Sequence, residues 1–382
     1  MKRVVIAFAS CIFLAVSVRA EVGLQKTPDR GIQPQAVVDA KGNLHLLYYS
    51  GDPRGGNLMY VRRDLGKKTL KQPIQVNSQD GSAIAVGTIR GGHLALGKGG
   101  RVHVAWNGSM KAEPKNPISG HPMMYTRLND QGTAFEPQRN LMTETSILDG
   151  GGSLAADSRG NVYVAWHAIG KDNAKEEGNR KVWISISKDD GKTFAGEKPA
   201  WDVNTGACGC CGLRAFADAK GDAYLIYRAA SAKVNRGMYV LRSANQGQTF
   251  AGQQLDNWKI DHCPMSSEAF AEGPRGVYVA WDNDGQVFFS LVRSPLIESD
   301  SVKWAPGKGG DRKHPALAFN KNGDMILVWT EGAGWNRGGA LAWQVYDKSM
   351  RPTESGRRAA AIPVWGLPAV FAEANGSFTI FH

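Results

Sequence analysis

The chain has 382 residues, 42% hydrophobic side chains and a formal net charge of +11 at neutral pH. This composition excludes a disordered chain, and the length exceeds that of one ordinary core unless the chain is built from repeats. The positive charge is spread along the sequence, with no basic run longer than three residues. We therefore expect an anionic small ligand, a glycan or an envelope surface as partner, and no nucleic acid.

Residues 1–20 have the pattern of a secretory signal peptide. A basic start precedes the apolar run 4–18, and Ala20 satisfies the small-residue rule for cleavage. The run is too short for a membrane span, and a lipid anchor on Cys11 is the alternative. We expect an exported protein, periplasmic or secreted, with no transmembrane segment, one domain over residues 21–382 and a monomeric state.

One hairpin pattern recurs seven times, as two alternating runs joined by a polar turn, and the second run closes on an aromatic residue or histidine. The closing residues are Tyr48, Trp106, Trp166, Tyr227, Trp281, Trp329 and His382. Period-2 strands repeated at this spacing, without helical stretches between them, predict an all-β propeller of four-stranded antiparallel blades.

Seven blades are favoured and six are the alternative. Six of the hairpins are followed by a second pair of candidate strands, which leaves the last hairpin, residues 369–382, without outer strands. A strand around Val22 to Lys26 can complete a seventh blade with that hairpin. Such a closure also holds both chain ends in place.

Two turns between outer strands share the pattern S-x-D/N-x-G-x-T-F. Their fixed positions are Ser187, Asp189, Gly191, Thr193 and Phe194 in the first, and Ser243, Asn245, Gly247, Thr249 and Phe250 in the second. A third, weaker copy spans Leu128 to Phe135. The expected role is structural: the Asp or Asn side chain accepts backbone hydrogen bonds, glycine supplies a positive φ, and the aromatic ring packs inward.

These turns resemble the Asp boxes (BNR repeats) of the sialidase, or neuraminidase, superfamily of β-propellers, over essentially the whole mature chain. The resemblance implies three arginines that hold the substrate carboxylate, a Tyr–Glu nucleophile pair and an early acidic residue. Here Pro34 matches the first motif, but Ile32 stands in the place of its arginine and Arg30 is out of register. Asp52 has the context of a turn residue rather than of the acid. Exo-sialidase activity is therefore not expected.

The resemblance places ligands at the axial mouth formed by the loops that enter each inner strand. Candidate ligand-binding residues there are Arg90, Arg214, His314, Trp335, Arg337 and Trp365. The favoured function is binding of a glycan or other small anionic ligand. Whether the protein is an enzyme is left open: a glycoside hydrolase or lyase is the alternative, with Asp149 and Asp261 as weak catalytic candidates.

All four cysteines after the leader precede inner strands of neighbouring blades. Cys208, Cys210 and Cys211 come before the fourth hairpin, and Cys263, beside His262, before the fifth. We expect these four cysteines to form one compact site at the mouth. Disulfides are the favoured chemistry in an exported chain, and a thiolate–imidazole site for copper or zinc is the alternative, followed by reactive thiols. No cofactor is firmly implied.

Overall fold

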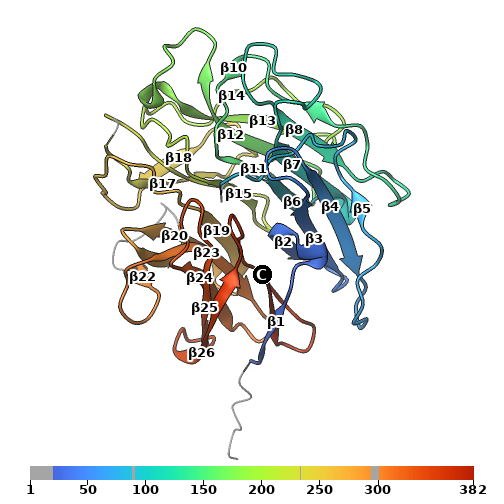
Figure 1. The fold of residues 1–382 in the computed structure, drawn as a ribbon, viewed down its shortest axis with the longest axis vertical. Helices are drawn as coiled ribbons and strands as arrows, with labels where there is room; N and C mark the ends of the chain where they lie inside the picture. Colours follow the sequence, from blue (N-terminus) through green and yellow to red (C-terminus); the bar gives the residue numbers. More distant parts are fainter. Residues whose placement is uncertain (1–19, 88–90, 233, 294–300) are drawn as a thin grey trace, which may run out of the picture.

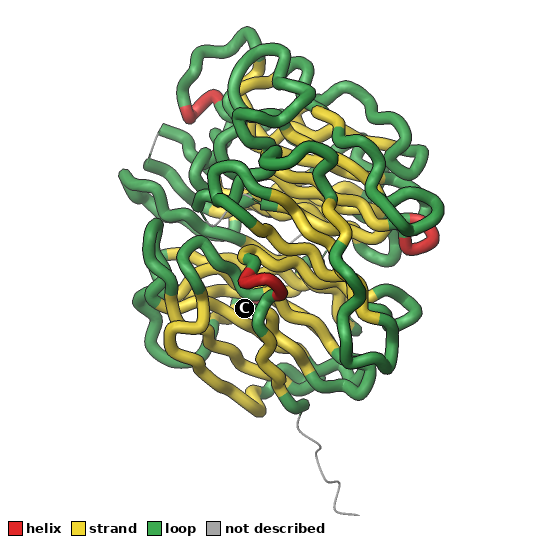
Figure 2. Tube along the Cα trace, turned by 45° about the vertical axis from the view of Figure 1, so that its right-hand side comes forward, coloured by secondary structure: helices red, strands yellow, loops and turns green. Residues whose placement is uncertain are grey.

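The computed structural model describes residues 20–87, 91–232, 234–293 and 301–382; residues 1–19 of the predicted leader lie outside them. Seven small sheets form a ring around a central axis (Figure 1). Figure 2 shows that strands and loops make up nearly all of the chain, with short 3₁₀ turns at η1 (Pro28–Arg30), η2 (Lys98–Gly100) and η3 (Glu177–Asn179). The described part contains no helix long and apolar enough to cross a membrane.

The first six blades are antiparallel meanders of four strands. From the axis outward they are β2 (Ile32–Val38), β3 (Leu44–Ser50), β4 (Asn57–Arg63) and β5 (Ile74–Gln75); β6 (Gly92–Leu96), β7 (Val102–Asn107), β8 (Met123–Arg127) and β9 (Arg139–Asn140); β11 (Gly152–Ala156), β12 (Val162–Gly170), β13 (Lys181–Ser187) and β14 (Lys198–Pro199); β15 (Leu213–Ala217), β16 (Ala223–Arg228), β17 (Met238–Ser243) and β18 (Ala251–Gln254); β19 (Glu268–Gly273), β20 (Gly276–Asn283), β21 (Gln286–Leu291) and β22 (Lys303–Trp304); and β23 (Arg312–Phe319), β24 (Met325–Glu331), β25 (Gly339–Tyr346) and β26 (Pro352–Ile362). A short strand, β10 (Thr145–Ser146), adds to β12 of the third blade.

The seventh blade joins the two ends of the chain, as predicted. It consists of β27 (Ala369–Ala372), β28 (Phe378–Phe381) and β1 (Val22–Gln25). β1 pairs with β28 in parallel, with Val22 opposite Phe378. The prediction of seven blades is confirmed and the six-blade alternative is wrong. Among the described residues this blade has three strands rather than the predicted four.

The core lies between neighbouring blades. Adjacent inner strands contact each other around the whole ring, and β27 contacts both β2 and β23 (Figure 1). The closing aromatics of the first six hairpins are all buried, with Tyr48, Trp106 and Trp166 at 0% exposure. Packing these large rings between sheets removes the apolar faces that a lone hairpin would expose to water. Most of the tryptophans at repeat positions therefore serve the core.

The S-x-D/N-x-G-x-T-F turns have the hydrogen bonds expected of them. Asp189 Oδ1 accepts the Thr193 N–H at 2.9 Å, and in the second copy Asn245 Oδ1 accepts the Thr249 N–H at 3.0 Å. Gly191 has φ +76°. The N–H of Asp190 donates to the Gly160 carbonyl at 2.9 Å. Because Gly160 belongs to the turn between β11 and β12, this motif lies on the face where the inner strands end.

Candidate functional site

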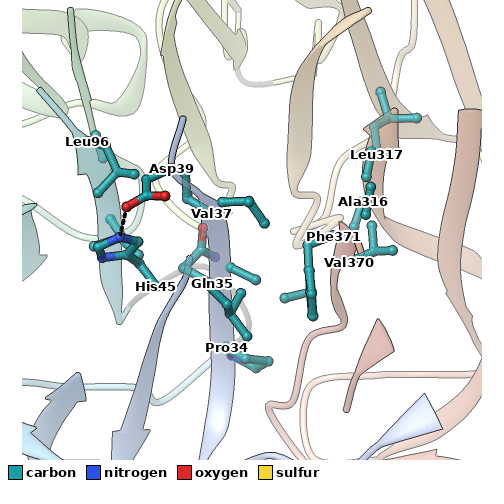
Figure 3. Close-up of a pocket in the computed structure, with 18 of the residues that line it drawn as sticks. Pro34, Gln35, Val37, Asp39, His45, Leu96, Ala316, Leu317, Val370 and Phe371 are labelled. Atoms are coloured by element: carbon teal, nitrogen blue, oxygen red, sulfur yellow. Dashed lines mark hydrogen bonds and ion pairs between the residues drawn. The ribbon is translucent and has the colours of Figure 1, made fainter. Parts of the chain in front are cut away.

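The inner strands enclose a central cavity of about 1750 Å³, to which every inner strand from β2 to β27 contributes. Its middle is apolar, and Figure 3 shows Leu317, Val370 and Phe371 in this part of the wall. Where the inner strands end, Asp39 Oδ2 lies 3.3 Å from Nε2 of His45, the contact dashed in Figure 3. The middle of the cavity is therefore apolar, and polar side chains lie at its other end, where the inner strands begin.

At that end, three consecutive blades place polar side chains at one level. His93 on β6, Ser153 on β11 and Arg214 on β15 each lie opposite the residue that precedes the closing aromatic of their blade. The Nδ1 atom of His93 is 3.1 Å from Ser153 Oγ and 2.9 Å from Nη1 of Arg214. His93 and Arg214 line the cavity. Their contacts make a continuous polar band across three blades.

The charge states of this pair follow from their contacts. Burial, with a smaller contribution from Arg214, lowers the pKa of His93 well below its usual value. Burial also lowers the pKa of Arg214 to about 10, which still leaves a cation at neutral pH. A guanidinium can only donate hydrogen bonds, so Nδ1 of His93 must be the acceptor and its proton sits on Nε2. The cavity end therefore presents a fixed positive charge beside a neutral imidazole.

Arg214 has no carboxylate within ion-pair distance among the described residues. Glu268 on β19 is the carboxyl group that acts on it electrostatically, but the two do not form an ion pair. An unpaired guanidinium in a protein interior is costly unless water or an anion compensates it. This feature is typical of an anion-binding site.

Glu268 is buried and neither of its carboxyl oxygens has a hydrogen-bond partner. Its Oε2 lies against Gly212, where a Cβ would be only 2.8 Å away. Burial raises the pKa of Glu268 well above its usual value, and Cys211 and Asp282 raise it further. The group is therefore held towards its protonated form, and such perturbed carboxyl groups mark candidate functional sites.

His314 lines the same end of the cavity but has a structural geometry. Its Nδ1 lies 3.0 Å from Ser267 Oγ, and its backbone N–H donates to Asp282 Oδ2 at 3.1 Å. The residue has φ +55° at an irregular point of β23, immediately before Pro315. Gln33 repeats this arrangement before Pro34, with φ +52°. Of the predicted ligand-binding residues, Arg214 and His314 reach the cavity.

The predicted tryptophans lie together at another place. The rings of Trp335 and Trp365 are 6.5 Å apart edge to face, and Trp365 Nε1 donates to the Trp335 carbonyl at 2.5 Å. Trp335 is 48% exposed. Arg337 folds back on its own loop, where its Nε donates to the Gly332 carbonyl at 2.7 Å. These three residues do not line the cavity.

Three of the four cysteines lie together in space. The Sγ atoms of Cys208, Cys210 and Cys211 all lie within 4.8 Å of one another, whereas Cys263 is exposed and outside this group. No disulfide joins the four cysteines, so the favoured disulfide chemistry is not found. The Sγ atoms of Cys208 and Cys211 are 2.9 Å apart, beyond the about 2.05 Å of a covalent bond. The single four-cysteine site is likewise not formed.

The remaining candidates lie apart from the cavity. Asp261 and His262 have side chains 90% and 71% exposed, with 3.4 Å between Oδ1 and Nδ1. Asp149 is partly buried and does not line the cavity. Asp52 caps its own turn by accepting the Arg54 N–H at 2.9 Å, as its sequence context predicts. Arg90 lies outside the described residues.

The residues of the polar band share a simple sequence signal, although the predicted ligand-binding residues included only Arg214 of this group. His93, Ser153, Arg214 and Glu268 each stand thirteen residues before the closing aromatic of their blade. Glu268 nevertheless pairs opposite Trp281 itself, because the turn between β19 and β20 has only two residues. A one-residue shift in register turns a side chain to the other face of the strand. This is why the Glu268 carboxyl lies against Gly212.

No protein-family model and no curated protein matches the chain. Among solved structures, it is similar to an α-L-arabinanase from Penicillium chrysogenum, complexed with arabinobiose, at 15% identity, covering 85% of this chain and 95% of the other with a TM-score of 0.54. It is also similar to the α-L-arabinofuranosidase Arb93A from Fusarium graminearum, at 14% identity, covering 87% and 98% with a TM-score of 0.52. These likenesses confirm the predicted β-propeller at the level of fold.

Proposed function

We propose that this protein binds a small anionic ligand with hydroxyl groups, such as a sugar acid or the acidic end of a glycan, at the polar end of the central cavity. The observation that carries the proposal is Arg214, a cation that lines the cavity without an ion-pair partner among the described residues. A carboxylate can occupy the fork of its guanidinium, and charge-assisted hydrogen bonds of this kind are the strong ones. His93 adds a neutral donor and acceptor for hydroxyl groups.

A glycan is the ligand class that also agrees with the fold neighbours, one of which was solved with arabinobiose. We also propose that residues 1–20 direct export to the periplasm or the exterior, and that the protein acts as a monomer. This function does not require the arginine triad of the sialidases, because the Arg214 guanidinium alone can form charge-assisted hydrogen bonds with one carboxylate.

Glycoside cleavage is the second candidate, and one observation favours it. The Glu268 carboxyl is held towards its protonated form by burial, which is the state required of a general acid. Hydrolysis by the usual route needs a second carboxylate across the bond. At this end of the cavity, Glu268 is the one carboxyl group among the described lining residues, so binding is the better supported function.

Isothermal titration calorimetry with uronic acids, sialic acid and their neutral counterparts tests the proposal. We expect binding of at least one acidic sugar, and a loss of about 10- to 100-fold in affinity in Arg214→Gln, the range for a hydrogen bond to a charged group. Arg242→Gln is the matched control, because Arg242 pairs with Asp222 at 2.6 Å and does not line the cavity. Equal affinity for acidic and neutral sugars, or unchanged affinity in Arg214→Gln, contradicts the proposal.

Turnover is measured on the same samples with chromogenic glycosides. Binding without turnover fits the favoured function. Turnover that is lost in Glu268→Gln while ligand affinity persists supports the hydrolase instead, since glutamine keeps the shape of the side chain and removes its acidic proton.

A further inference from the structure

The loop between β14 and β15 brings three thiols to one point. Sγ of Cys208 lies 2.9 Å from Sγ of Cys211 and 3.4 Å from Sγ of Cys210, and all three sulfur atoms lie within 4.8 Å of one another. Although Cys210 and Cys211 are adjacent in the chain, both of their sulfur atoms belong to this one group.

The loop is held in this conformation at several points. The Cys208 N–H donates to the Arg228 carbonyl at 2.9 Å, and the Cys211 N–H returns to the Cys208 carbonyl at 3.3 Å. Gly212 then bonds through its N–H to the Ser266 carbonyl at 2.8 Å, across to the next blade. At Gly209 a Cβ would lie 2.5 Å from Nη1 of Arg180, so a larger residue there would require the Arg180 side chain to move. The thiols are thus fixed by the surrounding blades before any ligand arrives.

The thiols are enclosed, and charged side chains lie beside them. Cys208 and Cys211 are fully buried and Cys210 is partly exposed, so the site is enclosed but reachable from one side. Arg236 pairs with Glu177 at 2.9 Å through two hydrogen bonds, while the Glu177 carboxylate is 3.9 Å from Arg180. The Nε atoms of Arg180 and Arg236 are buried without hydrogen-bond partners. Two guanidinium groups and the Glu177 carboxylate that pairs with them therefore lie beside the thiols.

The donor set selects among metals. Thiolates are soft ligands that favour Cu(I), zinc and iron–sulfur clusters. Structural zinc is almost always four-coordinate, whereas this group contains three sulfurs and, among the described residues, no imidazole or carboxylate. Three-coordinate Cu(I) matches the number of sulfur ligands in the group.

We propose that Cys208, Cys210 and Cys211 form a three-coordinate thiolate site for Cu(I). The three cysteines do not line the cavity that holds Arg214. The proposal of a Cu(I) site is therefore independent of the proposed ligand site. Binding exchanges the three thiol protons for one monovalent cation, without oxidation of sulfur. The expected metal–sulfur distance is about 2.3 Å.

The test uses the whole protein, purified under reducing and anaerobic conditions and stripped with a chelator. It is titrated with Cu(I) against a chromophoric competitor, and separately with Zn(II). We expect one Cu(I) per chain, sulfur as the only first-shell neighbour in X-ray absorption, and protection of three of the four cysteines from alkylation. Cys263, which is exposed, should remain reactive.

Two variants make the result specific. Cys210→Ser changes the partly exposed member of the group and should lose most of the Cu(I) affinity, whereas Cys263→Ser should keep it. Circular dichroism and thermal melts without metal check that both variants fold. The proposal is overturned by a reduced, folded protein that takes no Cu(I), by a site that takes Zn(II) in preference, or by a Cu(I) affinity that is unchanged in Cys210→Ser. A Cys208–Cys211 disulfide that persists through reduction overturns it as well.

Discussion

The guanidinium of Arg214 stands 2.9 Å from Nδ1 of His93, although 121 positions separate the two residues in the chain. Neither residue is a motif on its own, and each belongs to a different blade. The propeller brings them together because each stands at the same level of its inner strand. The pair presents a cation without a carboxylate partner, among the described residues, to the central cavity.

The first prediction is that Arg214 lowers the stability of the ligand-free protein. Replacing an uncompensated interior charge with an apolar side chain of similar length should stabilise the fold, so we expect Arg214→Met to raise the free energy of unfolding by about 1 kcal/mol. Urea denaturation without ligand measures this change.

Arg242→Met is the control, and it should lower the free energy of unfolding instead of raising it. It breaks the partly exposed ion pair with Asp222 and should cost at most about 1 kcal/mol. A destabilised Arg214→Met would show that the guanidinium is already compensated in the free protein.

The second prediction concerns Glu268 and high pH. Burial raises the pKa of this carboxyl well above its usual 4.5. The folded state therefore holds a proton that the unfolded state releases above about pH 4.5, so this group costs stability as the pH rises towards its folded pKa. Glu268→Gln should remove that cost and raise the melting temperature at pH 8 more than at pH 5.

Glu272→Gln provides the comparison, because Glu272 is an exposed carboxyl on the same strand. It should leave the pH dependence of melting unchanged. A melting temperature of Glu268→Gln that follows the parent protein at both pH values would show that Glu268 is ionised in the fold.

The third prediction concerns His314, which lowers stability as the pH falls rather than as it rises. Burial lowers the pKa of His314 to about 4, with Asp282 opposing the shift. Between about pH 6.5 and 4 the unfolded state binds a proton that the folded state does not, so stability is lost as the pH falls through this window. The shift from 6.5 corresponds to about 3 kcal/mol.

Replacing the imidazole tests this assignment. His314→Gln should flatten the loss of stability between pH 6.5 and 4, measured by urea midpoints, while it lowers stability near neutrality through the lost contact with Ser267. His262→Gln, at an exposed site, should keep the full acid dependence.

The architecture could be predicted from the sequence because each blade repeats the same physical pattern. Buried closing aromatics such as Trp106 and Trp166 are marked by period-2 alternation, and the unpaired last hairpin required the strand at Val22. The contacts among the cavity residues could not be predicted from these repeat patterns. The side of the strand on which Glu268 lies depends on a two-residue turn, and the exposed position of Cys263 depends on the path of an irregular loop. Repeat spacing determines the blade to which a residue belongs, but not these local paths.

The last prediction separates the conformational cost of replacing a turn glycine from the cost of a steric clash. Gly191 has φ +76°, and a Cβ there would stand against the Tyr125 hydroxyl, a buried group that also contacts His103 at 2.7 Å. Gly132, in the weaker copy of the turn, has a similar φ of +68° but nothing within 4 Å of its Cβ position. Gly132→Ala should therefore cost only the conformational term, about 1 kcal/mol. Gly191→Ala adds a clash with buried, hydrogen-bonded atoms and should cost about 3 kcal/mol or more. Chemical denaturation of the two variants measures the difference, and equal losses would show that backbone conformation alone requires glycine in these turns.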